Sequence, residues 1–457
     1  MKKLYTFILL LFICSIAIGQ DFIEHVIDNT IGFIPKVSIA DLDGDDNDDI
    51  VAITLQSDGL LVWFGDGNGN FENPIVIEDE NESSDGRHDI KFLDINNDNI
   101  LDILATPELD SDSGVQKQLI FYINNGDRTF QNRQFIDFVN INSRSINIID
   151  VDNDNFDDII VSGFSGGFSE LLFYPNLGNG TFGDASVLIQ EFGRGILVKD
   201  LNNDNLLDII REFGSPGIFL NGGDGTFTQQ DIPMGEIPSF CIFSDVIDQN
   251  NSPDLFLLGS GSSGGVGWYS NDGNANFSYE ETLNSLANQS HTEGRIADFD
   301  GDGDSDLIAG NVSDDQNLYW WRNQGNESFG NFIDITNSTG FVRSLEISDF
   351  NEDESIDFVI GHVNGVSWFE NNVPLSIEEN TIDFLTIAPN PSTGIYKIVG
   401  NQLLSQELEI KIYTITGQLI SEINNSRQIN LSSQLPGIYL ADILIGNKKQ
   451  VFKLIKY

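Results

Sequence analysis

The stretch Asp298-Phe299-Asp300-Gly301-Asp302-Gly303-Asp304-Ser305-Asp306 decides the fold of this chain. It places carboxylates at positions 1, 3, 5 and 9 of a nine-residue loop, and the apolar run Leu307-Ile308-Ala309 follows at once. Alternate residues carry the oxygens, the glycines let the backbone curl, and position 7 supplies a backbone carbonyl. Ca²⁺ takes about six to eight oxygen ligands from a flexible loop. The stretch therefore predicts a Ca²⁺-binding loop, with a solvated acidic turn as the alternative.

The same spacing recurs in six complete copies and one damaged copy, which we number in chain order. In loops one, two, three, four, six and seven, positions 1, 3, 5, 7 and 9 are Asp41, Asp43, Asp45, Asn47 and Asp49; Asp94, Asn96, Asp98, Ile100 and Asp102; Asp150, Asp152, Asp154, Phe156 and Asp158; Asp200, Asn202, Asp204, Leu206 and Asp208; Asp298, Asp300, Asp302, Asp304 and Asp306; and Asp349, Asn351, Asp353, Ser355 and Asp357. The damaged loop five has Val246, Asp248, Asn250, Ser252 and Asp254 at these positions. An EF-hand is excluded, because position 12 is alanine in loops one and six where that motif requires glutamate.

The spacing of the loops predicts the architecture. They begin at residues 41, 94, 150, 200, 246, 298 and 349, a period of 46 to 56 residues that indicates a repeat array or a propeller. In each repeat a short apolar strand enters the loop, a second leaves it, and a third ends in aromatic residues such as Trp63-Phe64. A turn rich in asparagine and glycine, a phenylalanine and a fourth strand follow. Four short strands per repeat without helical periodicity predict an all-β, seven-bladed β-propeller over residues 20–372.

The two ends of the repeat region predict how the ring closes. The seventh repeat stops at residue 372 without a fourth strand, whereas residues 22–27 form a strand before any acidic loop. We expect residues 22–27 to pair into the last blade, which leaves no open lateral edge. The repeated aromatic residues can be platforms on which sugars stack, but their recurrence in the blades favours packing between blades.

The repeats resemble the FG-GAP/VCBS family, which includes the propellers of integrin α-subunits and many bacterial surface proteins. The resemblance rests on the recurring Asp-x-Asp/Asn-x-Asp-x-x-x-Asp loop and covers about residues 22–372. It implies that the six complete loops bind Ca²⁺ between the first and second strands of each blade, on the face opposite the usual ligand face. It does not identify a ligand.

Residues 1–19 have the form of an export signal. Two lysines precede a mostly apolar run over residues 4–18, and small residues lie at −3 and −1 of a cleavage site before Gln20. A lipid anchor on Cys14 is the alternative, but Ile13 stands where a small residue is expected. After cleavage Cys241 is the only cysteine, so no intrachain disulfide forms, and bound Ca²⁺ becomes the expected source of stability. We expect no transmembrane segment in the mature chain.

Charge divides the mature chain in two. Residues 21–384 hold 13 lysines and arginines against 67 aspartates and glutamates, whereas residues 385–457 hold 7 against 4. The acidic part is not expected to bind nucleic acid, which needs basic side chains on its phosphates. Residues 373–384 are predicted to be a linker. Alternating strands with Gly/Pro turns over residues 385–457 predict a small antiparallel β-sandwich.

The C-terminal segment resembles the C-terminal sorting domain of the type IX secretion system of Bacteroidota. The resemblance rests on segments such as Ile387-Ala388-Pro389-Asn390-Pro391 and Leu435-Pro436-Gly437-Ile438-Tyr439. It implies that the type IX secretion machinery is a partner and that the protein reaches the cell surface or the medium. A carbohydrate-binding sandwich is the alternative.

No catalytic constellation is evident in the sequence. Two Gly-x-Ser-x-Gly matches, at residues 163–167 and 261–265, fall in turns after a second strand, whereas a hydrolase needs that serine on a strand-to-helix elbow. The four histidines include no pair at metal-binding spacing. We therefore expect a non-enzymatic binding or adhesion module for a glycan or an extracellular protein. A polysaccharide-active enzyme and a structural surface-layer component are the alternatives.

A partial ring of cations is predicted on the ligand face. Arg144, Arg194 and Arg343 each lie six residues before position 1 of their loop, and His88 holds that place in repeat two. If the strand that enters each loop is the innermost one, these side chains lie at the channel rim opposite the acidic loops. Arginine suits a carboxylate or sulfate ligand. The alternative is that each cation pairs with a carboxylate of a neighbouring blade and clamps the ring.

Overall fold

The computed structural model describes residues 21–457 with gaps at 55–59, 78–88, 107–116, 140–141, 166–167, 191–194, 213–216, 233–238, 248–249, 251, 260–264, 284–290, 312–317, 326–327, 336–339, 374–385, 400–407, 415–418, 425 and 446–447. The described residues form strands, turns and loops, and none of them forms a helix. No helix in this part of the chain is therefore long and apolar enough to cross a membrane. The predicted export signal lies outside the described residues.

Seven four-stranded antiparallel sheets make up the first unit of the chain, which ends at residue 374. In blades one to six the strands pair in sequence order, so that each sheet is one repeat. Blade one has β2 (Lys36–Ala40), β3 (Asp49–Ile53), β4 (Leu60–Trp63) and β5 (Ile75–Val76); blade two has β6 (Ile90–Leu93), β7 (Asp102–Ala105), β8 (Lys117–Tyr122) and β9 (Gln134–Val139). Blade three has β10 (Asn142–Ile149), β11 (Asp158–Ser165), β12 (Phe168–Tyr174) and β13 (Ser186–Gln190); blade four has β14 (Gly195–Lys199), β15 (Asp208–Glu212), β16 (Gly217–Asn221) and β17 (Phe227–Asp231). Blade five has β18 (Ser239–Asp245), β19 (Asp254–Gly259), β20 (Val266–Asn271) and β21 (Phe277–Leu283); blade six has β22 (His291–Ala297), β23 (Asp306–Asn311), β24 (Leu318–Trp321) and β25 (Ile333–Ile335).

Blade seven joins the two ends of the repeat region and confirms the predicted closure. It contains β26 (Val342–Ser348), β27 (Asp357–His362), β28 (Gly365–Asn371) and, as its outer strand, β1 (Phe22–Asp28). β1 pairs antiparallel with β28, and the ring of Phe22 packs edge-on against Phe358 of the same blade and Trp320 of blade six. The N-terminal strand therefore closes the ring and leaves no open edge between the first and last blades.

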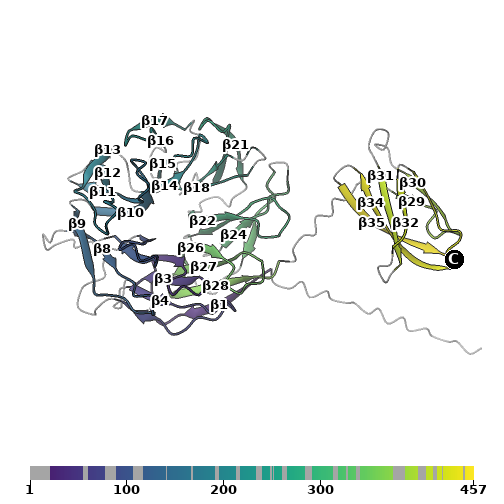
Figure 1. Cartoon of the computed structure of the whole chain (residues 1–457), viewed down its shortest axis with the longest axis horizontal. Coiled ribbons are helices and arrows are strands. Elements are labelled where there is room, and N and C mark those ends of the chain that lie inside the picture. The colour runs from purple at the N-terminus through teal and green to yellow at the C-terminus, as the bar shows by residue number, and fades with distance from the viewer. Residues whose placement is uncertain are drawn as a thin grey trace, which may run out of the picture. The chain divides into compact units, whose positions relative to one another are not determined.

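The strand that enters each acidic loop is the innermost strand of its blade. β2, β6, β10, β14, β18, β22 and β26 contact one another in a closed circle, and Figure 1 shows β10, β14, β18 and β22 on the inner side of the ring. The second strands are buried on both faces, as in β3 and β27, because a neighbouring blade covers each face of the sheet. The prediction of a seven-bladed, all-β propeller is confirmed.

The second unit is a small two-sheet sandwich, as predicted. One sheet contains β29 (Thr386–Ala388), β30 (Ile395–Val399) and β33 (Gln428–Asn430); the other contains β32 (Leu419–Asn424), β31 (Leu408–Thr414), β34 (Gly437–Ile445) and β35 (Lys448–Lys456) in that order. Its core includes Tyr396 and Ile429 from the first sheet and Ile410 and Leu454 from the second. Of the predicted linker, Val373 is buried in the core shared by blades six and seven, and the remaining residues lie outside the described part of the chain.

Candidate metal centres

Each acidic loop connects the first and second strands of its blade, where the resemblance placed it. The aspartate at position 1 organises the backbone of the loop. In loop one, Asp41 accepts hydrogen bonds from the backbone N–H groups of Asp45 at 3.2 Å and Asp46 at 3.0 Å. The same two bonds, from positions 5 and 6 to position 1, recur at 2.8–3.2 Å in loops two, three, four, six and seven. One side chain therefore curls the loop around its own carboxylate.

Positions 4 and 6 take the left-handed backbone conformation in all six complete loops, with φ between 57° and 91°. Position 4 is Gly44, Asn97, Asn153, Asn203, Gly301 or Glu352, and position 6 is Asp46, Asn99, Asn155, Asn205, Gly303 or Glu354. Glycine adopts this conformation freely, and asparagine and aspartate tolerate it better than other residues. The composition of the loop is therefore set by its backbone as well as by its oxygen atoms, and loop seven is the strained exception.

The aspartate at position 9 is the first residue of the second strand and is buried in all seven blades. In loop one, Asp49 accepts the N–H of Leu42 at position 2 and the N–H of Gly65 in the turn after the third strand, both at 2.9 Å. The turn bond recurs at 2.7–2.8 Å in the other six blades. The position 2 bond recurs at 2.9–3.1 Å in blades two, three, four, five and seven. Position 9 thus fastens each loop to its blade.

Burial raises the pKa of six of these aspartates far above the ordinary value, and the other carboxylates of each loop raise it further. The pKa is about 6 for Asp102, Asp158 and Asp208, about 7 for Asp49 and Asp357, and about 8 for Asp306. The two backbone N–H groups act in the opposite direction in most loops but do not cancel the effect. These sites therefore disfavour the full set of negative charges unless a cation compensates them.

Loop five shows that position 9 can fasten a loop to its blade even when position 1 carries no carboxylate. It lacks a carboxylate at position 1, where Val246 stands, yet Asp254 at position 9 keeps both backbone bonds, from Ile247 at 3.1 Å and Asn271 at 2.7 Å. Asp248 at position 3 lies outside the described residues. The fastening role of position 9 therefore does not depend on a complete set of oxygen donors.

Among the described residues, three loops bring carboxylates close enough to share a metal ion. One oxygen from each member of a trio lies within 4.8 Å of the others in Asp41, Asp43 and Asp45; in Asp150, Asp152 and Asp158; and in Asp298, Asp300 and Asp302. The donors are hard oxygen atoms, which suit Ca²⁺ and Mg²⁺ better than softer metals. Loops two, four and seven have asparagine at position 3 and contribute one carboxylate fewer.

Comparisons with known proteins support the repeat structure and both domains. The model of the FG-GAP-like repeat matches residues 41–105, 247–309 and 298–360, and the model of the secretion system C-terminal sorting domain matches residues 386–457. The chain contains FG-GAP-like repeats and a secretion system C-terminal sorting domain. The sorting domain indicates export through type IX secretion to the cell surface or the extracellular space. No curated protein sequence matches the chain significantly.

Two similar solved structures with TM-scores above 0.5 share the fold over 75% and 78% of this chain. The BP39L lectin from Burkholderia pseudomallei is 12% identical, with 75% of this chain and 96% of that chain covered and a TM-score of 0.54. BBS1N, solved in complex with ARL6DN and soaked with lead, is 11% identical, with 78% and 98% covered and a TM-score of 0.51. The rhamnogalacturonan lyase PL11 of Bacillus licheniformis is 11% identical, with 77% and 72% covered and a TM-score of 0.46.

The side chain at position 7 packs against a glycine in the turn of the same FG-GAP-like repeat. A Cβ atom on Gly178 would lie 2.4 Å from the ring of Phe156, and one on Gly126 would lie 2.7 Å from Cδ1 of Ile100. These two side chains hold the turn in place and carry no oxygen atom, so position 7 of loops two and three can offer only its backbone carbonyl to a metal. This explains why Phe156, Ile100 and Leu206 occupy a position in a loop that is otherwise polar.

In blades one, two, five and seven the turn also donates a hydrogen bond to the loop of the preceding repeat. The side-chain amide of Asn124 in blade two donates to the carbonyl of Leu42 in loop one at 2.6 Å, and Asn371 in blade seven donates to Phe299 in loop six at 2.8 Å. From the sequence alone, these turns were recognised only as rich in asparagine and glycine. Their recurring Asn-x-Gly spacing was the signal that could have identified them as structural residues.

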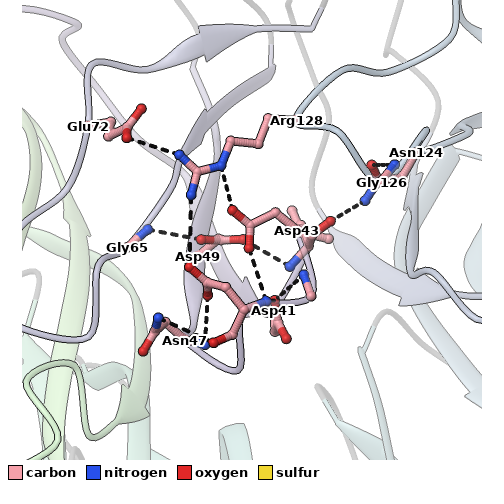
Figure 2. Close-up of polar contacts among 12 residues, drawn as sticks. Asp41, Asp43, Asn47, Asp49, Gly65, Glu72, Asn124, Gly126 and Arg128 are labelled. Carbon is pink, nitrogen blue, oxygen red and sulfur yellow. Dashed lines mark hydrogen bonds and ion pairs between the residues drawn. The ribbon is translucent and has the colours of Figure 1, made fainter.

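Two arginines form ion pairs with aspartates of acidic loops. Neither was predicted from the sequence as a site residue. Figure 2 shows the guanidinium of Arg128, from the turn of blade two, between Asp43 of loop one and Glu72. Its Nε donates to Asp43 at 2.5 Å, and its Nη2 lies 3.8 Å from Asp45. Arg322 forms an ion pair with Asp300 of loop six, and its guanidinium lies over the ring of Trp320 at 5.1 Å.

The aromatic residues at the ends of the third strands are buried, which confirms that they pack the ring. Trp63, Trp268, Trp320, Trp321 and Trp368 are at most 4% exposed. Trp320 donates its Nε1–H to the buried Asp306 at 3.0 Å. These rings are not available for stacking sugars.

Of the cations predicted on the ligand face, the structure describes the side chain of Arg343 alone. His88 and Arg194 lie outside the described residues, and for Arg144 only the backbone, in β10, is described. Arg343 is exposed on β26 at the end opposite the acidic loop, with its guanidinium 5.5 Å from the ring of Phe33. Their role in binding therefore stays a prediction.

Two other cations of the innermost strands are paired across blades. Lys36 of blade one lies 3.3 Å and Arg295 of blade six 2.7 Å from the carboxylate of Glu346 in blade seven, and Arg295 also pairs with Glu293. Burial alone would raise the pKa of Glu346, but Arg295 and Lys36 lower it to about 2. These groups stay charged and join blades six, seven and one, as the clamp alternative describes.

Proposed function

We propose that this secreted propeller binds Ca²⁺ in its acidic loops and acts at the cell surface or in the extracellular space as a binding or adhesion module for a glycan or a protein. The observation that carries the proposal is the trio of close carboxylates Asp150, Asp152 and Asp158 in loop three, a loop held by backbone bonds to position 1. The donors are oxygens, and the loop backbone is curled around them. This combination suits the larger, flexibly coordinated Ca²⁺ better than Mg²⁺, which demands near-octahedral geometry.

The residues that would hold an ion are the odd positions of a complete loop. Positions 1, 3, 5 and 9 would contribute carboxylate or amide oxygens, and position 7 would contribute its carbonyl. The ion would neutralise the repulsion among the carboxylates. In a chain without an intrachain disulfide, a ligand of the folded state adds stability directly.

Calorimetric titration of the chelated full-length protein with Ca²⁺ tests this part of the proposal. We expect heat-releasing or heat-absorbing binding at several sites, with Kd values in the range of ~10⁻⁴–10⁻³ M that extracellular modules use. The absence of any Ca²⁺ binding would contradict it. Mg²⁺ at the same concentration is the matched control.

The ligand would bind at the end of the blades opposite the acidic loops, where Arg343 is exposed. Arg144, Arg194 and His88, which the sequence predicts at this end, are the further candidate residues. A glycan array and an extracellular protein panel, each screened with and without EDTA, test this assignment. Replacing Arg144, Arg194 and Arg343 together by glutamine should abolish binding with little loss of stability if they form the site. A large fall in stability with binding intact would make them a clamp.

We propose a binding role and no catalytic one. Both described histidine side chains are engaged in packing: His25 stacks on Trp368 and bonds to Glu370, and the buried His362 bonds to Ser367. Incubation of the purified protein with a panel of polysaccharides separates the two possibilities. New reducing or unsaturated ends would contradict the binding role.

A further inference from the structure

Loops one and six share a feature that distinguishes them from the other acidic loops. In each, the aspartate at position 3 forms an ion pair with an arginine from outside the loop: Asp43 with Arg128, and Asp300 with Arg322. Both aspartates are nearly or fully buried, with 6% and 0% of the side chain exposed. A buried carboxylate that already has a charge-assisted partner needs a cation less than one that has none.

The other loops treat position 3 differently. In loops two, four and seven it is asparagine, whose amide donates to the aspartate at position 5 at 2.9–3.1 Å. Loop three alone has aspartate at position 3 without an ion pair to a lysine or arginine among the described residues. Its Asp152 is exposed and belongs to the close trio with Asp150 and Asp158. Among the described residues, loop three therefore has the one close carboxylate trio that no lysine or arginine compensates.

We propose that Arg128 and Arg322 are built-in counter-cations that take the place of Ca²⁺ in loops one and six, and that loop three is the strongest Ca²⁺ site. The inference rests on the proposed Ca²⁺ binding. Arg128 contacts two of the three carboxylates that form the trio of loop one, so an ion could use these oxygens fully only by displacing the guanidinium. The arginine also joins blade two to Glu72 of blade one and so keeps the loop ordered without metal.

Arg128 occupies a turn position that is glycine in several other repeats, so its side chain is not part of the turn that these repeats share. Arg128 lies two residues before Phe130, the phenylalanine that follows the turn of its repeat, and has a left-handed backbone with φ of 63°. The same place is glycine in three other repeats: Gly69, Gly180 and Gly225. In blade one, the N–H of Gly69 donates to the carbonyl of Phe350 in loop seven at 2.9 Å, so this place lies on the preceding loop.

Gly225 offers the reciprocal test, because its turn belongs to blade four, which follows loop three in the ring. Its φ is 78°, close to that of Arg128, and a Cβ atom built on it meets nothing within 4 Å. An arginine can therefore be installed there with the backbone conformation that Arg128 already adopts. Arg128→Gly and Gly225→Arg thus form a matched pair that moves the counter-cation from loop one to loop three.

The experiment is calorimetric titration of the full chain with Ca²⁺ for the wild type, Arg128→Gly, Arg322→Leu and Gly225→Arg, with melting temperatures measured in EDTA. We expect Arg128→Gly and Arg322→Leu each to gain one site, and Gly225→Arg to weaken the tightest site by about tenfold, or ~1.4 kcal/mol. In EDTA, Arg128→Gly should melt below the wild type, and Ca²⁺ should stabilise it more than it stabilises the wild type.

The outcomes separate this inference from the proposed function. Equal Ca²⁺ stoichiometry in the wild type and Arg128→Gly would overturn the counter-cation role and leave Ca²⁺ binding intact. Loss of a site other than the tightest in Gly225→Arg would overturn the ranking of loop three. Absence of Ca²⁺ binding by every variant, each folded by its melting curve, would overturn both proposals.

Discussion

Loops three and five occupy equivalent places in blades three and five, and their difference shows that an acidic loop has two layers with different roles. Loop three has carboxylates at positions 1, 3, 5 and 9, whereas loop five has valine at position 1. Both keep the buried aspartate at position 9 and its two backbone bonds. The inner layer at position 9 therefore serves the fold even where the donor set is incomplete, and positions 1, 3 and 5 form an outer layer that would bind a cation together with position 9.

The largest expected effect comes from removing the cation from all loops at once. If four loops bind with a Kd of ~10⁻⁴ M, Ca²⁺ at ~1 mM stabilises the fold by ~1.4 kcal/mol per loop, or about 6 kcal/mol in all. We therefore expect EDTA to lower the melting temperature markedly. An unchanged melting curve after thorough chelation would show that the outer layer has no cation to lose.

The next largest effect is expected from the inner layer, where loop five gives the cleanest test. Asp254→Ala leaves the buried N–H groups of Ile247 and Asn271 without their acceptor. Each unsatisfied group costs ~1–3 kcal/mol, so we expect a loss of about 3 kcal/mol in the free energy of unfolding. The loss should be the same in Ca²⁺ and in EDTA, as measured by urea denaturation. A loss that disappears in EDTA would mean that loop five also binds the cation.

The stability of the metal-free protein and that of the Ca²⁺-bound protein should depend differently on pH. Burial raises the pKa of Asp306 to about 8 and that of Asp49 and Asp357 to about 7, whereas the unfolded chain has the ordinary low value. The metal-free folded state therefore holds more protons than the unfolded state, and its stability falls as pH rises from about 5 to 8. Ca²⁺ requires the ionised carboxylates and should flatten or reverse this slope. Melting curves over this pH range in EDTA and in Ca²⁺ check the prediction, and identical slopes would contradict it.

The outer layer of loop three can be removed without touching the inner one. Asp152 is exposed, and its carboxylate belongs to the trio with Asp150 and Asp158. We expect Asp152→Ala to cost about 1.4 kcal/mol at ~1 mM Ca²⁺ and less than ~0.5 kcal/mol in EDTA. Chemical denaturation in the two buffers measures both values. Equal costs in both would place Asp152 in the structural layer instead.

The propeller could be predicted from the sequence because its signals are local and repeated. The loop spacing, the aromatic strand ends and the early strand at residues 22–27 each depend on a few neighbouring residues, and the structure confirms the blades and the closure. Position 9 could be located but not assigned its buried bonds, because its partners are backbone groups of a turn 13 to 22 residues away.

The ion pairs on the loops could not be predicted for the same reason. Arg128 reaches Asp43 across 85 residues of sequence and Arg295 reaches Glu346 across 51, so each pair depends on which blades are neighbours. In the sequence, Lys36 and Arg295 lie closer to their loops than Arg144, Arg194 and Arg343 do, and the clamp was the alternative for the predicted ring of cations. The packing of blades six, seven and one against one another decides in favour of the clamp for these two residues.

The smallest expected effect concerns the backbone that both layers share. Glu354 at position 6 of loop seven has φ of 71°, a conformation that loops two, three and four give to asparagine. Glutamate in this conformation costs ~1–2 kcal/mol, and asparagine costs less, so Glu354→Asn should stabilise the protein by about 0.5 kcal/mol. Glu354→Gln is the matched control, because it removes the same charge and keeps the unfavourable backbone preference. If the two variants are equally stable in EDTA, the gain comes from charge and the backbone of loop seven is not strained. If only asparagine stabilises, the left-handed turn limits the composition of the acidic loop independently of any cation.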